Sequence, residues 1–161
     1  MESFKELVQK RRSVRKFTEQ DIPAEDLQVI LRAALMAPTS KGTRGWHFIV
    51  VDDKDMLEKI SMCRNMGSQF VAGAKAAIVV LGDREITDVW CEDASLAAVT
   101  MQYQATDLGI GSCWCQVRNR VTDGGESTES YLRTLLKLET HHNLLCVIGI
   151  GYPAIAENGI A

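Results

Sequence analysis

Four cations and a hydroxyl group lie within six residues near the start of the chain. They are Arg11, Arg12, Ser13, Arg15 and Lys16. Guanidinium groups bind phosphate oxygens through paired, charge-assisted hydrogen bonds, and a nearby hydroxyl or backbone N–H can complete such a site. The cluster therefore predicts a phosphate site, with a solvated basic surface as the alternative. Because the whole chain carries a net charge of -3, a nucleic-acid partner held by a basic field is disfavoured.

Cysteines and histidines are the other candidates for chemistry. The sequence C-W-C at 113–115 lacks the C-x-x-C spacing of zinc and redox sites. His141 and His142 are adjacent, and adjacent side chains on a regular element point apart, so we predict no metal site. The chain has five cysteines, an odd number, and shows no export signal, so we expect reduced thiols and not a disulfide framework. With no apolar run long enough for a membrane span, these features predict a cytoplasmic protein with no membrane contact.

The elements that position these residues follow from local patterns. Ser3 and Glu6 form a capping box for a short helix that should end at the basic cluster. Apolar residues recur at helical spacing from Leu27 to Leu35, and this pattern stops before Pro38. Further helices are expected around 57–60, 92–108 and 128–137, with a short one at 69–72.

Four segments predict strands, at 46–51, 76–81, 112–117 and 144–150. The second is apolar at every position, which is typical of a strand covered on both faces. The length of 161 residues and the composition, 46% hydrophobic and 24% charged, suit one globular domain over 1–161. Together these features predict an α+β fold in which helices cover a layered sheet.

Six motifs in order make the chain resemble the nitroreductase family of FMN-dependent oxidoreductases. They are R-R-S-V-R-K-F at 11–17, A-P-T-S at 37–40 leading to W-H-F at 46–48, the buried strand at 76–81, D-A-S-L-A-A at 93–98, L-G-I-G-S-C-W at 108–114 and G-Y-P at 151–153. The resemblance implies a three-layer sandwich, with a mixed central sheet covered by helices, assembled as a homodimer. It also implies FMN as cofactor and NADH or NADPH as hydride donor.

The resemblance assigns roles to the basic cluster. Arg11, Arg12 and Ser13 match residues that hold the FMN phosphate and ribityl chain. Arg15 matches a cation near the N1–C2 carbonyl side of the isoalloxazine ring, where negative charge develops when hydride reaches N5. A surface ion pair is the alternative for Arg15.

A turn is implied to complete each site from the second subunit. It consists of Pro38, Thr39 and Ser40. Each site would then need two chains, whereas an ordinary helix stop is the alternative. Most relatives carry Asn, Gln and Pro where this chain has Gly42, Arg44 and Gly45, a difference that would change the substrate pocket or the cofactor preference.

A strand segment is implied to pass the flavin and to offer a backbone N–H toward N5. It consists of Trp114, Cys115 and Gln116. Buried strand thiols are the alternative for the cysteines, and we favour it for Cys113. The family usually has a basic tail after G-Y-P, but 154–161 contains no basic residue, so FMN affinity would be lower. The polar segment 121–130 is expected to be either a mobile loop over the pocket or a plain surface loop.

The implied activity is that of an FMN-dependent NAD(P)H oxidoreductase of nitroreductase type. It would reduce nitroaromatics, quinones or a related small molecule by two electrons, through ping-pong hydride transfer. We name no catalytic residue, because the flavin carries the reaction. The alternatives are a protein that stores or senses FMN with little turnover, and a module that holds another phosphate ligand without flavin.

Overall fold

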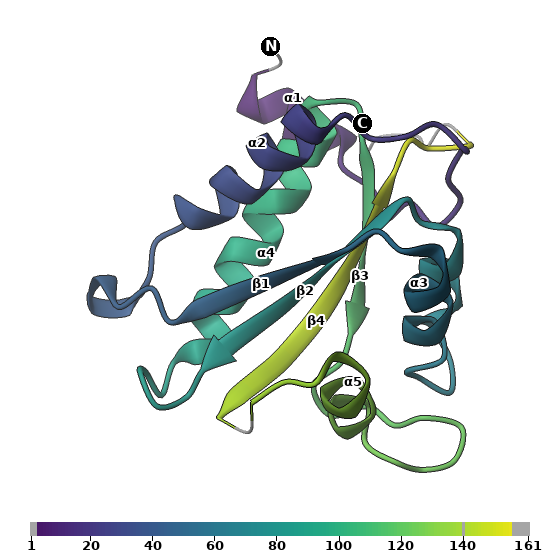
Figure 1. Ribbon diagram of the computed structural model, residues 1–161. Helices are drawn as coiled ribbons and strands as arrows, with labels where there is room; N and C mark the ends of the chain where they lie inside the picture. Colours follow the sequence, from purple (N-terminus) through teal and green to yellow (C-terminus); the bar gives the residue numbers. More distant parts are fainter. Residues whose placement is uncertain (1–2, 140, 156–161) are drawn as a thin grey trace.

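The computed structural model describes residues 3–139 and 141–155, which form a sheet between two helical layers (Figure 1). The helices are α1 (Phe4–Lys10), α2 (Ala24–Leu35), α3 (Lys54–Ile60), α4 (Trp90–Asp107) and α5 (Thr128–Leu136), with 3-10 turns η1 (Ser40–Gly42) and η2 (Gln69–Gly73). The strands are β1 (Trp46–Val51), β2 (Ala76–Asp83), β3 (Gly111–Gln116) and β4 (His142–Gly151). The predicted α+β sandwich is confirmed.

The sheet has the strand order β1-β2-β4-β3, and each neighbouring pair is antiparallel. β2 and β3 run in the same direction, but β4 lies between them and so prevents a parallel pair. The expected mixed character of the sheet needs correction in this respect. Among the described residues, parallel pairing is limited to one bridge between Ser13 and Ser112.

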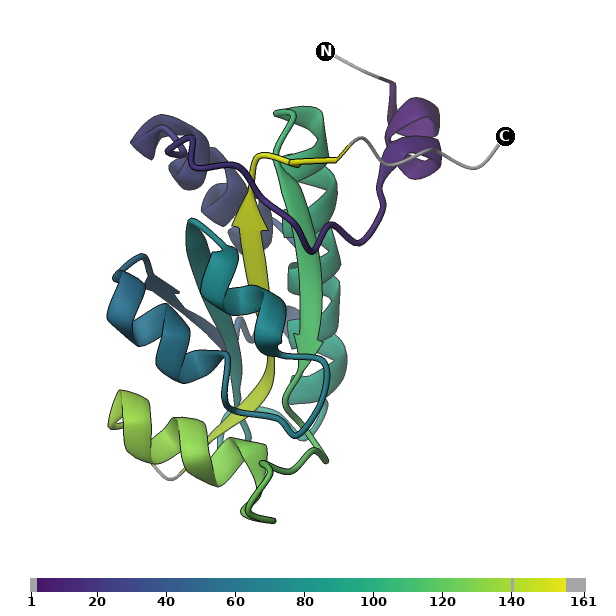
Figure 2. The same cartoon turned by 90° about the vertical axis from the view of Figure 1, so that its right-hand side faces the viewer.

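Helices cover both faces of the sheet, as Figures 1 and 2 show. On one face Ile30 of α2 and Met101 of α4 belong to the core, and on the other face Ile60 of α3 and Leu132 of α5 do so. Every residue of β2 is buried, as its apolar sequence predicts. None of the described helices combines the length and the apolar composition that a membrane crossing needs.

Helix ends follow local signals in most cases. The capping box forms, since the Glu6 N–H donates to Ser3 Oγ (3.3 Å) and the Ser3 N–H donates to the Glu6 carboxylate (2.9 Å). α4 begins at Trp90, slightly before the acidic pair that suggested its start. The segment 121–130 is closed by a bridge between Val121 and Ser127 and leads into α5.

Candidate functional site

Residues 11–18, here called the strap, cross the sheet at the end where β3 begins and β4 ends (Figure 2). The Val14 N–H donates to the Ser112 carbonyl (2.9 Å), and the Thr18 N–H donates to the Tyr152 carbonyl (2.8 Å). The Ala154 N–H donates to the carbonyl of Lys16 (2.9 Å), which completes an antiparallel bridge between Phe17 and Pro153. The basic cluster is therefore fixed to the sheet by backbone hydrogen bonds at Val14 and at Lys16.

Two glycines allow the strap to approach the sheet this closely. A Cβ atom at Gly111 would lie 2.8 Å from the Val14 side chain, and one at Gly151 would lie 2.8 Å from the Phe17 ring. Real Cβ atoms essentially never come so near, so a larger residue at either position would lift the strap. The glycines of the G-I-G and G-Y-P motifs thus have a packing role.

We expect Gly111→Ala to lower the free energy of unfolding by about 1–3 kcal/mol, the usual cost of overpacking. Urea denaturation followed by circular dichroism measures this change. Gly73→Ala is the matched control, because a Cβ atom there meets no atom within 4 Å. Equal stability of the two variants would contradict the close-approach account.

Alternate strap side chains converge on the Cys113 thiol of β3. Burial raises the pKa of Cys113, and the charge of Arg15, a hydrogen bond with Ser13 and the charge of Arg11 oppose that rise. The Arg11 guanidinium also lies over the ring of Tyr103 in α4, 6.0 Å from its centroid. Two cations and a hydroxyl therefore share one corner beside β3.

Arg12 faces another side of the strap. With Lys10 it lines a cavity of about 220 Å³ that also includes Gly109, Gly111 and Pro153. Its Nη1 group donates to the carbonyl of Arg11 (2.5 Å). The structure thus keeps Arg12 at the same end of the sheet but separates it from the corner formed by the other predicted residues.

β3 is an edge strand, and its free edge continues from the strap. The carbonyl of Ser112 points to this edge, because it accepts the hydrogen bond from the strap. Backbone groups alternate in direction along a strand, so the N–H groups of Trp114 and Gln116 point the same way. The indole N–H of Trp114 also donates to the side-chain oxygen of Gln116 (2.8 Å). Two backbone donors can therefore serve a ligand that lies along this edge.

Cys115 differs from its two neighbours. By the same alternation its backbone groups point to β4, and its thiol is buried in the core beneath α3 and α5. A hydrogen bond from Cys63 and the charge of Arg64 lower the pKa of the Cys115 thiol, against the opposing effect of burial. The alternative of a buried strand thiol therefore describes Cys115, and it also fits Cys113. All five cysteines of the chain are free thiols, as predicted.

The turn at 38–40 lies at the other end of α4 from the strap (Figure 1). The Ser40 N–H donates to Asp93 Oδ1 (3.0 Å) in the first turn of α4. Arg11 packs against Tyr103, which lies ten residues further along this helix, or about 15 Å at 1.5 Å per residue. The two predicted halves of the site consequently do not meet within one chain.

Asp93 is a site residue that the sequence showed only as part of a helix motif. Its side chain is buried and holds the turn through Ser40. The Thr39 hydroxyl accepts a hydrogen bond from the N–H of Arg44 (3.1 Å), whose φ of 51° lies in the left-handed region. These contacts hold the turn in place although Arg44 has a strained backbone conformation.

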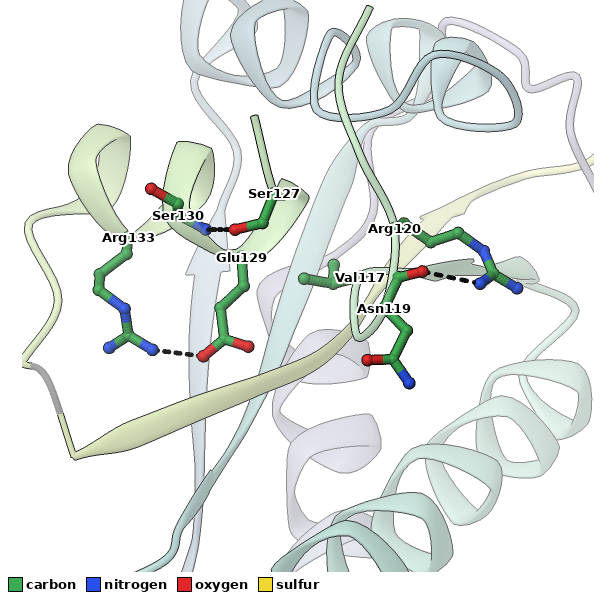
Figure 3. Close-up of a pocket in the computed structure, with 7 residues that line it drawn as sticks. All are labelled: Val117, Asn119, Arg120, Ser127, Glu129, Ser130 and Arg133. Atoms are coloured by element: carbon green, nitrogen blue, oxygen red, sulfur yellow. Dashed lines mark hydrogen bonds and ion pairs between the residues drawn. The ribbon is translucent and has the colours of Figure 1, made fainter. Parts of the chain in front are cut away.

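A second cavity, of about 360 Å³, lies at the opposite end of the sheet from the strap (Figure 3). It is lined by Val117, Asn119, Arg120, Ser127, Glu129, Ser130 and Arg133. An ion pair between Glu129 and Arg133 forms one wall. Because 121–130 borders this cavity and not the strap corner, the plain surface loop is the better description of that segment.

Comparison with known proteins agrees with the motifs. The family model "Nitroreductase family" matches residues 8–63 and 62–152. A protein of Archaeoglobus fulgidus named "Putative NADH dehydrogenase/NAD(P)H nitroreductase" is 37% identical over 157 residues, which cover 95% of this chain and 87% of that protein. The structure of an FMN-dependent nitroreductase from Clostridium difficile R20291 is 46% identical, with a TM-score of 0.94, and the match covers 96% of this chain and 90% of that one. The chain therefore belongs to the nitroreductase family.

Proposed function

We propose that the chain is an FMN-dependent NAD(P)H oxidoreductase of nitroreductase type, with 1–161 as a single flavin-binding domain. The observation that carries this proposal is the convergence of Arg11, Ser13 and Arg15 beside the free edge of β3. The names of the similar proteins, an FMN-dependent nitroreductase and an NAD(P)H nitroreductase, support it. A cytoplasmic location is proposed because the cysteines are free thiols.

The donor groups of the corner fit FMN. Two guanidinium groups and a hydroxyl match the needs of a phosphate and its ribityl chain. The backbone N–H groups of Trp114 and Gln116 suit the polar edge of an isoalloxazine ring. When bound, the flavin would supply the redox chemistry by accepting hydride from NADH or NADPH and passing two electrons to the acceptor.

The protein's part in this chemistry is position and charge. Arg15 is exposed at the corner, where its cation would stabilise negative charge on the N1–C2 side of the ring. With a quinone acceptor and one proton from solvent, the products are NAD(P)⁺ and the hydroquinone. With a nitroaromatic acceptor they are NAD(P)⁺, the nitroso compound and water. Neither reaction requires a side-chain nucleophile.

Two observations support a homodimer with shared sites. First, α1 contains no buried residue, and apolar side chains of the helical layer formed by α1, α2 and α4 are exposed. They are Phe4, Val8, Leu35, Met36 and Leu96. Second, the strap and the turn at 38–40 are too far apart within one chain. We propose that a second copy covers these apolar residues and that its turn completes the strap corner of the first.

We expect the purified protein to show flavin absorption bands that NADH or NADPH bleaches without oxygen. The bands should return when a quinone or a nitroaromatic is added, and steady-state oxidation of NAD(P)H measures turnover. Bound flavin that neither nucleotide reduces would favour the storage or sensing alternative. A colourless protein that takes up no added FMN would favour the module for another phosphate ligand.

A further inference from the structure

The three histidines of the chain gather around one carboxylate, at the end of the sheet opposite the strap. His47 lies in β1, Asp83 ends β2, and His142 begins β4, with His141 just before it. Figure 1 shows these strand ends side by side. The side chains of His47, Asp83 and His142, here called the His/Asp cluster, come from three adjacent strands, whereas His141 shares Asp83 with Glu85 in a separate group.

The register of the sheet places the cluster on one face. Asp83 pairs directly with His142, and His47 pairs with Leu81, two residues before Asp83. Since side chains two residues apart share a face, these groups project to the same side. One ligand atom from each of His47, Asp83 and His142 lies within 4.8 Å of the others.

The distances suit an ion between the groups. Asp83 Oδ2 lies 3.6 Å from Nε2 of His141 and 3.8 Å from Nε2 of His142. Both separations exceed the ~3.2 Å limit of an ordinary N–H···O hydrogen bond. A tetrahedral zinc ion with bonds of about 2.0–2.1 Å sets its ligand atoms about 3.3 Å apart. Small rotations of the side chains would reach that spacing.

The two adjacent histidines do not serve one group of ligands: His142 lies with His47 and Asp83, and His141 lies with Asp83 and Glu85. His141 precedes β4, so the alternation of a strand does not apply to it. The rings of His141 and His142 lie 4.3 Å apart, and both are close to Asp83. The ring of His47 lies 4.7 Å from that of His142.

Hydrogen bonding and burial prepare these groups to bind a metal. Asp83 is only 7% exposed, and its Oδ1 accepts a hydrogen bond from the N–H of Glu85 (2.9 Å), so Oδ2 remains directed at the histidines. Such outer hydrogen bonds orient the ligands of known metal sites.

We propose that the His/Asp cluster binds one divalent transition-metal ion, with Zn²⁺ as the ion of choice. Imidazole and carboxylate are donors that zinc takes in tetrahedral sites, whereas Ca²⁺ and Mg²⁺ prefer oxygen ligands alone. Bound there, the ion would join β1, β2 and β4 at the end of the sheet opposite the strap. It would therefore be a structural site, because it uses no residue of the strap corner.

Equilibrium dialysis of the tag-free, full-length protein against Zn²⁺, with elemental analysis, tests the site. We expect saturable binding of one ion per chain, and a Kd raised at least about tenfold in His47→Ala and His142→Ala. His47 is exposed, so its replacement should leave the fold intact, which circular dichroism checks. Asp83→Asn should weaken binding in the same way.

Two control variants keep the proposal open to refutation. Asp88→Asn removes an exposed carboxylate outside the cluster, and Cys91→Ser removes a half-buried thiol; both should bind zinc as the parent does. Binding that does not saturate, or that survives unchanged in both histidine variants, would overturn the proposal. Loss of binding in Cys91→Ser would do so as well, because it would assign the zinc to a thiolate.

Discussion

Replacement of Arg11 by alanine is expected to lower the affinity for FMN at least about tenfold. A charge-assisted hydrogen bond contributes about 1.5–3 kcal/mol, and each 1.4 kcal/mol is a factor of ten in Kd. Arg11 is a partly exposed residue beside Tyr103, so its loss removes charge without opening the core. Quenching of flavin fluorescence, during titration of the apoprotein with FMN, measures the change.

Two further arginine variants test whether the loss of FMN affinity depends on where the removed charge lies. Arg12→Ala removes a cation that faces another cavity, so we expect a smaller loss than for Arg11→Ala, although family resemblance implies a role for both. Arg84→Ala removes an exposed arginine just beyond the far end of β2 and should leave FMN affinity unchanged. If Arg11→Ala bound FMN as tightly as the parent protein, the phosphate assignment would be wrong.

A mixed dimer of two damaged chains should recover about half of the flavin sites. One chain carries Arg11→Ala, and the other carries Ser40→Trp, whose bulk would occupy the space of the ring. Ser40 is exposed in the single chain, so the large side chain should not disturb its fold. If each site combines a strap from one chain with a turn from the other, the mixed dimer has one intact site. In each parental homodimer both sites are damaged.

Two affinity tags allow the mixed dimer to be purified, after sedimentation has shown that the parent protein is a dimer at micromolar concentration. Bound FMN per dimer and steady-state NAD(P)H oxidation are the two readouts. A mixed dimer of two wild-type chains with the same tags is the control and should match the untagged enzyme. Sites built from a single chain predict a different result, because both sites of the mixed dimer would then be damaged and activity would not recover.

Much of the fold is predictable from local sequence. β1 lies at the six residues that its β-branched pattern indicates, and α2 ends where the apolar repeat meets Ala37 and Pro38. The capping box at Ser3 and Glu6 forms because its hydrogen bonds join residues three positions apart. These signals depend on near neighbours in the chain, so they can be predicted without knowledge of any tertiary contact.

The arrangement of side chains on the strap could not be predicted from local sequence. The charge of the strap suggested a phosphate site, but the sequence gives no sign that Arg11, Ser13 and Arg15 share one corner while Arg12 faces another cavity. That division follows from the hydrogen bond between Val14 and Ser112, which joins segments almost one hundred residues apart. Likewise, Cys115 matched a family motif, but the alternation of β3 directs its backbone groups toward β4. Its N–H therefore does not reach the free edge, unlike those of Trp114 and Gln116.

The sequence by itself determined the positions of the helices and strands, the basic cluster and the family resemblance. Only the tertiary structure decided which of these residues meet. β4 inserts between β2 and β3, which makes the paired strands antiparallel, leaves β3 as an open edge and brings His142 beside Asp83. The physical reason is that strand order is selected by burial of apolar faces over the whole sheet, a property that no short segment of sequence contains.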